Sequence, residues 1–365
     1  MYQPNPPQMP QYPQQPPKKP RKKAGLIALI LLLVVCVLVL VGISVVVPTF
    51  MADALSLAPT PTPSPTKPPT PTPSPTPAFN PDVGAILPKN RVVAFYAIPG
   101  APATGPAYQL TDTMLEQLKQ QGAAYEQIDP EHPVKLGIDL VVSVPDGSPG
   151  PQHTYSHHVD EATIQQYIDF CQEHDLLLFL DLNFGQSAIM PEVNFFLPYL
   201  QKYSFVHMAV DPEWMFPRHD GVPGTNLSNV RASDLNPIIE AVAEIPMKYH
   251  VPRKMLIIHQ YRPSGDDLKN PYDASKAEIA DKRNLRFDPR VDVVLHVDSV
   301  GGYPGDHEDK VEQYTQWVQG DMQKYNNFKY GGFKIFYKIE SKTGIMTPDE
   351  VMKLDPAPLV ITYGN

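Results

Sequence analysis

Eight short apolar runs recur along the chain from Arg91 onward, and they constrain its fold more than any other feature. Each run is rich in Val, Ile, Leu or Phe, and amphipathic segments separate several of them. Near-continuous apolar strands that alternate with helices are typical of a parallel sheet buried on both faces. The eight runs are Arg91–Ile98, Lys135–Val144, Leu176–Leu182, Phe205–Val210, Lys254–Tyr261, Val291–Val297, Phe333–Ile339 and Leu359–Tyr363.

Helical periodicity marks the segments between the runs. Apolar residues recur there at i, i+3, i+4 and i+7, which is the spacing of one helix face. Two such sets are Ile164, Tyr167, Ile168 and Cys171, and Leu235, Ile238, Ile239 and Val242. Eight strand and helix units predict an α/β fold, a (β/α)8 TIM barrel. We expect it to lack a regular eighth helix, since the last run reaches Tyr363 and the sequence ends at Asn365. The alternative is an open doubly wound sheet, although no glycine-rich phosphate motif follows the first run.

One further segment, residues 24–47, contains no charged residue. A helix of this length spans the ~30 Å hydrocarbon core of a bilayer. Five basic residues lie just before it, at Lys18, Lys19, Arg21, Lys22 and Lys23, and no such cluster follows. The positive-inside rule therefore predicts a single-pass signal anchor in the cell membrane. The disordered Pro/Gln-rich tail, residues 1–23, would be cytoplasmic, and the C-terminal domain extracellular. The alternative is a cleaved signal peptide with Ala52-Asp53-Ala54 as its cleavage site.

Residues 48–81 are predicted to form an extracellular stalk, because Pro alternates with Thr and Ser through most of them and favours extended polyproline II. The barrel domain is expected over residues 82–365. From Phe79 onward there are 38 acidic residues and 24 Lys and Arg. This excess of negative charge argues against nucleic acid as a partner. Cys171 is the only cysteine in that part of the chain, and its place on an apolar helix stripe indicates packing.

Polar residues follow or interrupt the apolar runs close to their carboxyl ends. A TIM barrel places its active site at this end of the strands. Several acids converging at one barrel mouth would indicate a functional site, because unpaired charge is costly beside apolar side chains. The residues so placed are Tyr96, Asp139, Asp181, Asp211, Glu213, His259, Gln260, His296, Asp298 and, on the seventh run, Tyr337 or Lys338.

The fourth run carries the sharpest pair, Asp211 and Glu213. Residues i and i+2 of a strand point to the same face, so we expect the two carboxylates to lie close together and one pKa to rise. A proton donor beside an anionic partner is the arrangement used in glycoside hydrolysis. Trp214 follows directly and offers an indole face to a sugar ring. The alternative is that Pro212 ends the strand and the acids pair with Lys334 or Arg262.

A metal site formed by His259, His296 and Asp298 is a further alternative. Metal-dependent barrel hydrolases usually carry His-x-His on the first strand, and the first run here contains no histidine. We therefore predict no metal and no other cofactor. His207 has the parity of Asp211 but lies deeper in its run, so we expect a hydrogen-bonded core histidine. No Gly-x-Ser-x-Gly motif supports a serine nucleophile.

Several blocks, "VVAFYAIPGAP", "DPEWMF", "LIIHQYRP", "LHVDSVGG" and "FKIFYKI", resemble a group of exported or lipid-anchored actinobacterial proteins with a glycoside-hydrolase-like TIM barrel. The resemblance spans most of Arg91 to Tyr363. It departs at Ala97, where the group tends to have Gly, and at Lys338, where it tends to have an acid. The residues that it highlights are Asp211, Glu213, Trp214, His259, Gln260, Arg262, His296, Asp298, Lys334 and Tyr337. More remotely, Asp-x-Glu looks like the motif of chitinases and family-twenty-five muramidases.

The sequence thus predicts a membrane-anchored glycosidase-like hydrolase acting on a cell-envelope or environmental polysaccharide. Glu213 would be the general acid, and Asp211 would orient it and raise its pKa. Asp181 or Asp298 would hold a water molecule or an oxocarbenium-like centre. The expected substrate-binding residues are Trp214, Tyr96, Asp139, His259, Gln260, Tyr261, His296, Lys334 and Tyr337. The alternative is a non-catalytic module that binds carbohydrate or a wall component.

Overall fold

The computed structural model describes residues 79–226, 228, 230–260 and 279–365. Within these residues, no helix is both long enough and apolar enough to cross a membrane. The predicted tail, the anchor at 24–47 and nearly all of the stalk lie outside the described residues, as do Tyr261 and Arg262.

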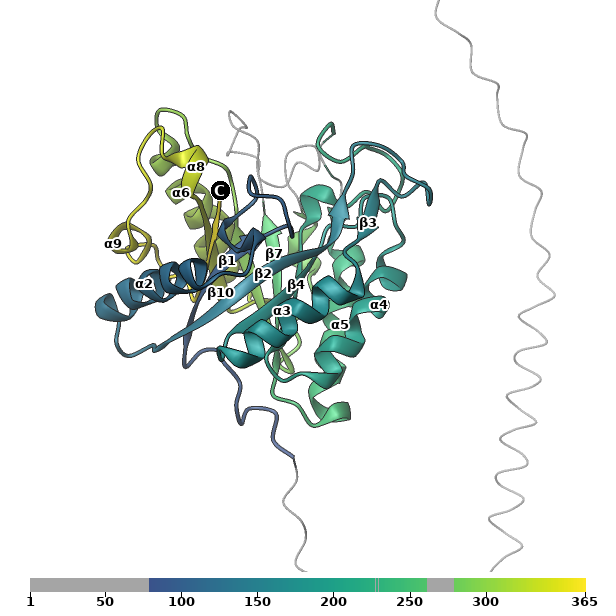
Figure 1. Ribbon diagram of the computed structural model, residues 1–365, viewed down its shortest axis with the longest axis horizontal. Coiled ribbons are helices and arrows are strands. Elements are labelled where there is room, and N and C mark those ends of the chain that lie inside the picture. The colour runs from purple at the N-terminus through teal and green to yellow at the C-terminus, as the bar shows by residue number, and fades with distance from the viewer. Residues whose placement is uncertain (1–78, 227, 229, 261–278) are drawn as a thin grey trace, which may run out of the picture. The chain divides into compact units, whose positions relative to one another are not determined.

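Eight parallel strands form a closed barrel (Figure 1). Each strand pairs with its two neighbours, and β1 closes the ring because it pairs with both β11 and β2. The closed ring confirms the predicted barrel and excludes the open sheet. The strands in order are β1 (Arg91–Ala97), β2 (Val134–Pro145), β4 (Leu177–Leu182), β5 (Val206–Val210), β7 (Lys254–Gln260), β9 (Val291–Val297), β10 (Tyr330–Phe336) and β11 (Val360–Gly364).

Helices cover the outside of the barrel (Figure 1). Both predicted apolar stripes are buried, one in α3 and one in α5. After β9, the π-helix η5 (Thr315–Gly320) lies between two α-helices. The longer helices are α2 (Asp112–Ile128), α3 (Glu161–Glu173), α4 (Ile189–Lys202), α5 (Ala232–Tyr249), α6 (Asp306–Tyr314) and α7 (Asp321–Tyr325).

The connections after β7 and β10 depart from regular β/α units. The described part of the β7–β9 connection contains β8 (Ile279–Ala280) and the short helix η4 (Lys282–Asn284). The β8 strand pairs outside the barrel with β6 (Val230–Arg231). Two four-residue helices, α8 (Tyr337–Glu340) and α9 (Pro348–Val351), link β10 to β11. One extra strand, β3 (Ser156–His158), pairs antiparallel with β2.

The seventh barrel strand lies three residues earlier than predicted. It begins at Tyr330 and ends at Phe336, so Tyr337 and Lys338 belong to α8. Two glycines allow the early start. A Cβ atom on Gly332 would lie 2.3 Å from Cδ2 of His296, and one on Gly331 would lie 2.2 Å from the Tyr314 hydroxyl. The absence of side chains on these glycines permits this close packing. In the sequence, however, two adjacent glycines suggest that a strand is interrupted.

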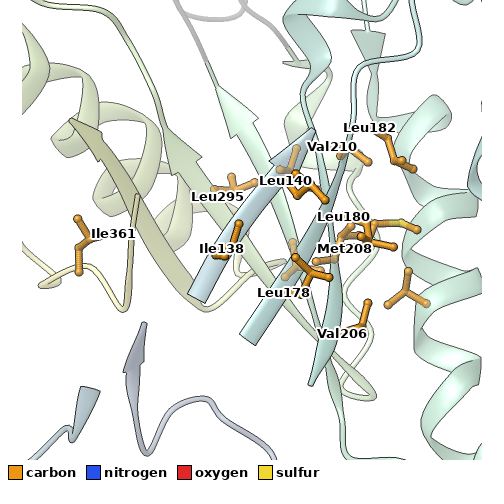
Figure 2. Close-up of a cluster of buried hydrophobic side chains, with 14 of the residues drawn as sticks. Ile138, Leu140, Leu178, Leu180, Leu182, Val206, Met208, Val210, Leu295 and Ile361 are labelled. Carbon is orange, nitrogen blue, oxygen red and sulfur yellow. The ribbon is translucent and has the colours of Figure 1, made fainter. Parts of the chain in front are cut away.

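Strand side chains alternate between two apolar layers, because successive residues point to opposite faces. Figure 2 shows part of the outer layer, between the strands and the helices, with residues such as Leu180, Met208 and Leu295. A smaller inner layer fills part of the barrel and includes Phe179 and Ile257. The inner layer explains why the predicted runs are almost continuously apolar.

We expect the substitution Gly105→Ala to destabilise the protein by about 1–3 kcal/mol, since it forces extra volume into a filled site. A Cβ atom on Gly105 would lie 1.7 Å from the Tyr96 carbonyl oxygen, so the loop before the short helix η2 (Pro106–Tyr108) must move away from β1. Denaturant unfolding measures the change. Gly147→Ala is the matched control, because nothing lies within 4 Å of its added Cβ. Equal stability of both variants would contradict this close approach.

Candidate functional site

The inner face of the barrel changes from apolar to polar toward the carboxyl ends of its strands. Ala94, Phe179 and Ile257 are each followed two residues later by a polar residue of the same face, namely Tyr96, Asp181 and His259. Strand register places Tyr96 beside Asp139 and His259 beside His296. We call the buried polar set the inner cluster. It consists of Asp139, Asp181, Asp211, His259, His296, Asp298 and Lys334, each at most 4% exposed.

His259 lies at the centre of the inner cluster. Its Nε2 atom is 3.7 Å from Oδ2 of Asp139 and 3.8 Å from Oδ2 of Asp181. Its Nδ1 atom is 3.3 Å from Oδ2 of Asp298 on the other side of the ring. Burial alone would lower the pKa of His259, but the charges of Asp181 and Asp298 raise it to about 9. The histidine therefore joins carboxylates from three other strands or strand ends.

Lys334, on β10, supplies the second positive charge. Its Nζ atom is 3.5 Å from Oδ2 of Asp298 and 3.6 Å from the centre of the Tyr96 ring. Burial would raise the pKa of Asp298, but Lys334 and His259 hold it well below its usual range. Burial would likewise lower the pKa of Lys334, but Asp298 and the other acids raise it. Asp298 and Lys334 therefore form a buried ion pair.

The remaining acids of the inner cluster hold their protons more tightly than usual. Burial raises the pKa of Asp139, and it raises the pKa of Asp181 to about 7. Burial and the Asp298 carboxylate raise the pKa of Asp211 to about 8. Four carboxyl groups face only two cationic side chains, so full ionisation would leave an unbalanced buried negative charge. Protons on these acids reduce that charge near neutral pH.

We expect Asp211→Asn to stabilise the protein increasingly as the pH rises from about 4 to about 8. Over this range Asp211 is ionised in the unfolded chain but largely protonated in the fold, so its contribution to stability falls with pH. Asparagine cannot ionise, so the Asp211→Asn variant does not lose stability in this way. The gain should reach about 2 kcal/mol at pH 8, since one pKa unit corresponds to about 1.4 kcal/mol and neighbouring acids share the protons. Denaturant unfolding at several pH values measures it, and a gain that does not change with pH would contradict the assignment.

The structure separates Asp211 from Glu213 in a way that the strand pattern did not predict. The strand β5 ends at Val210, and Asp211 caps the short helix η3 (Pro212–Trp214). The expectation that both carboxylates share one strand face is therefore wrong, because the turn at Pro212 ends the extended backbone. Asp211 is buried, and its Oδ1 atom accepts a hydrogen bond from the Glu213 backbone N–H at 3.4 Å. Glu213 itself is half-buried.

Trp214 is half-buried beside Glu213. Its carbonyl oxygen accepts a hydrogen bond from the Gly185 N–H at 2.9 Å, which joins η3 to the loop after β4. The described rim of the barrel thus holds an acid and an indole on one short turn.

Three other predicted residues, Gln260, Tyr337 and Lys338, lie outside the inner cluster. Gln260 follows His259 directly on β7 and therefore points to the other face of the strand. Tyr337 stacks on Tyr363, with ring centres 4.8 Å apart, and donates a hydrogen bond to Gln121 at 2.8 Å. It lines a separate cavity of about 630 Å³ between η2 and α2. Lys338 is exposed, and its Nζ atom donates to the Pro102 carbonyl at 2.7 Å.

Thr362 is a member of the site that the sequence analysis missed. It lies on β11 with its side chain buried, and its hydroxyl is 3.2 Å from Nε2 of His296. Burial lowers the pKa of His296 well below its usual value, so this ring is neutral. The sequence signal for Thr362 was its polar side chain within the last apolar run.

His207 is a buried core histidine, as predicted. Its Nδ1 atom accepts a hydrogen bond from the Met255 backbone N–H at 3.1 Å. Burial lowers the pKa of His207 well below its usual value, which keeps the ring neutral. Figure 1 shows β2, β4 and β7, which carry Asp139, Asp181 and His259, at the centre of the domain.

Comparison of the chain with protein-family models and with curated proteins returns no match.

Proposed function

We propose that this protein is a glycoside-hydrolase-like barrel that cleaves a glycosidic bond at the carboxyl ends of its strands. The observation that carries the proposal is that half-buried Glu213 and buried Asp211 of the inner cluster lie on one turn, where the Glu213 backbone N–H donates to Asp211. Glycoside hydrolysis needs a proton donor that reaches the leaving-group oxygen and a second carboxyl group nearby. Glu213 would donate the proton, and Asp211 would orient the turn.

The residues around this pair also suit a sugar. Trp214 adjoins Glu213 and offers an aromatic surface. Asp181 and Asp298 flank His259 in the inner cluster, and an ionised carboxylate there would stabilise positive charge at a reacting sugar carbon. The net negative charge from Phe79 onward favours a neutral polysaccharide over an acidic one.

The substrate would be a polymer of the cell envelope or of the surroundings. This part of the proposal rests on the sequence, in which an uncharged segment, residues 24–47, follows five basic residues and precedes a Pro/Thr-rich stalk. The anchor would hold the barrel outside the membrane, and the stalk would let it reach the polymer.

Incubation of the full chain with a panel of neutral polysaccharides tests the proposal. New reducing ends, detected by chromatography of the released sugars, are the expected result. Saturable binding to a polysaccharide without any product would instead support a non-catalytic carbohydrate-binding module. The burial of the acids below Glu213 favours that second candidate, because a bound sugar would touch only the rim.

A further inference from the structure

Three buried side chains of the inner cluster bring their donor atoms to one point inside the barrel. They are Asp139 on β2, Asp181 on β4 and His259 on β7. One oxygen of each carboxylate and one ring nitrogen all lie within 4.8 Å of one another. All three side chains have 0% exposure. Within the described part of the chain, both oxygens of each aspartate and both nitrogens of His259 are without a hydrogen-bond partner.

The distances between these atoms suit a shared ion better than direct hydrogen bonds. The separations of 3.7 Å and 3.8 Å from Nε2 to the two carboxylates exceed the usual length of a hydrogen bond. Two ligand atoms that each lie ~2.1 Å from a zinc ion are ~3–4 Å apart. Buried polar atoms without partners are costly, and a cation would satisfy several of them together.

The other side of His259 has the arrangement of a metal-binding histidine. A histidine that binds metal through one nitrogen usually donates the N–H of the other to a carboxylate, which fixes the ring. Nδ1 of His259 faces Asp298 at 3.3 Å, and Lys334 holds Asp298 at 3.5 Å. Nε2 is thereby directed at Asp139 and Asp181.

We propose that Asp139, Asp181 and His259 bind a divalent transition-metal ion, such as Zn²⁺ or Mn²⁺, inside the barrel. Imidazole together with two carboxylates favours these ions over Mg²⁺ and Ca²⁺, which prefer oxygen ligands alone. With His259 neutral, the ion and Lys334 balance the carboxylates of Asp139, Asp181 and Asp298. The sequence predicts no metal because the first run lacks the His-x-His motif, and the metal alternative that it offers groups His259 with His296 and Asp298. In the fold, Nε2 of His296 instead faces Thr362.

This inference goes beyond the proposed hydrolysis and does not depend on it, although both use Asp181 and Asp298. The ion would join β2, β4 and β7, the strands that carry its three ligands. Its test is metal binding, so a failure of the metal site and a failure of the glycosidase proposal are distinguishable.

The full chain, stripped of metal with a chelator and dialysed, is titrated separately with ZnCl₂, MnCl₂ and MgCl₂ by calorimetry. Elemental analysis then counts the retained metal. We expect one Zn²⁺ or Mn²⁺ per chain, bound at least tenfold more tightly than Mg²⁺. The double variant Asp139→Asn/Asp181→Asn should lose this binding. Asp298→Asn should keep the stoichiometry but weaken affinity about 10- to 100-fold, because it leaves Nδ1 of His259 facing a neutral amide in place of a carboxylate.

Asp292→Asn is the matched control. Asp292 is also a buried aspartate, but it lies at the start of β9 and pairs with Arg253 at 2.8 Å, so metal affinity should not change. Circular dichroism checks the fold of each variant. If the double variant does not fold, Asp298→Asn still tests the site. Absence of stoichiometric binding to the wild type would overturn the proposal, as would equal affinity in the wild type and in the folded variants of Asp139 and Asp181 or of Asp298. A protonated His259 would then be the cation between the acids.

Discussion

Glu213→Gln is expected to lower kcat for a natural polysaccharide about 100- to 10,000-fold, the usual contribution of a positioned general acid. The amide keeps the size of the side chain but cannot donate a proton to the leaving oxygen. KM should change little, since Glu213 would act in the transition state rather than in binding. Initial rates of reducing-end release by both proteins measure the effect, using whichever polysaccharide the wild type cleaves.

A second substrate separates proton donation from a purely structural role. An aryl glycoside with an acidic phenol as leaving group needs little protonation, so Glu213→Gln should lose much less activity toward it. Glu240→Gln is the matched control, because Glu240 is half-exposed and pairs with Arg286 on the outer surface. It should be as active as the wild type. An equal loss toward both substrates would remove Glu213 from the acid role, and an unchanged rate toward the polysaccharide would sink the assignment.

Much of the barrel could be predicted from the sequence because its strands are buried on both faces. The outer face of each strand packs against helices and the inner face fills the barrel, so apolar residues run almost without interruption. Polar residues on the inner face, such as Asp181 and His259, therefore stood out from the apolar residues around them in the sequence. The apolar stripes of α3 and α5 were readable because helical period and burial coincide.

What the sequence could not supply is geometry between distant residues. The position of His259 between Asp139, Asp181 and Asp298 depends on the register of separate strands, which no single run encodes. The turn at Pro212 also changed the relation of Asp211 to Glu213, because a parity argument holds only while the backbone stays extended. Tyr337 was predicted on the seventh strand but lies just after it, because β10 begins earlier and includes Gly331 and Gly332. The close packing around these two glycines involves residues that are distant in the sequence.

Lys334→Met is expected to destabilise the protein by about 3–5 kcal/mol at neutral pH, the usual result of removing one partner from a buried ion pair. Methionine fills much of the lysine volume but leaves the Asp298 carboxylate without its lysine neighbour at 3.5 Å. It also removes the cation over the Tyr96 ring. Nδ1 of His259 then remains 3.3 Å from the Asp298 carboxylate. Denaturant unfolding, followed by circular dichroism, measures the loss.

The pH dependence of this loss identifies its electrostatic cause. In the wild type the depressed pKa of Asp298 contributes stability that is present above pH ~4 and lost as the pH falls. The raised pKa of Lys334 contributes stability that is present below pH ~10 and lost as the pH rises further. The difference in the free energy of unfolding between the wild type and Lys334→Met should therefore be largest in the upper part of the range from pH ~4 to pH ~10. It should narrow toward acidic pH, where Asp298 becomes protonated in the variant.

Two comparisons separate the buried pair from ordinary packing. Lys135→Met breaks an exposed ion pair with Asp175, whose atoms are 3.1 Å apart, and should cost at most about 1 kcal/mol. The double variant Lys334→Met/Asp298→Asn should recover part of the stability, because it removes the stranded charge as well. A double variant no more stable than Lys334→Met would mean that lost packing, not an unpaired carboxylate, causes the effect. Charge balance within the inner cluster would then contribute less to stability than the geometry of the cluster implies.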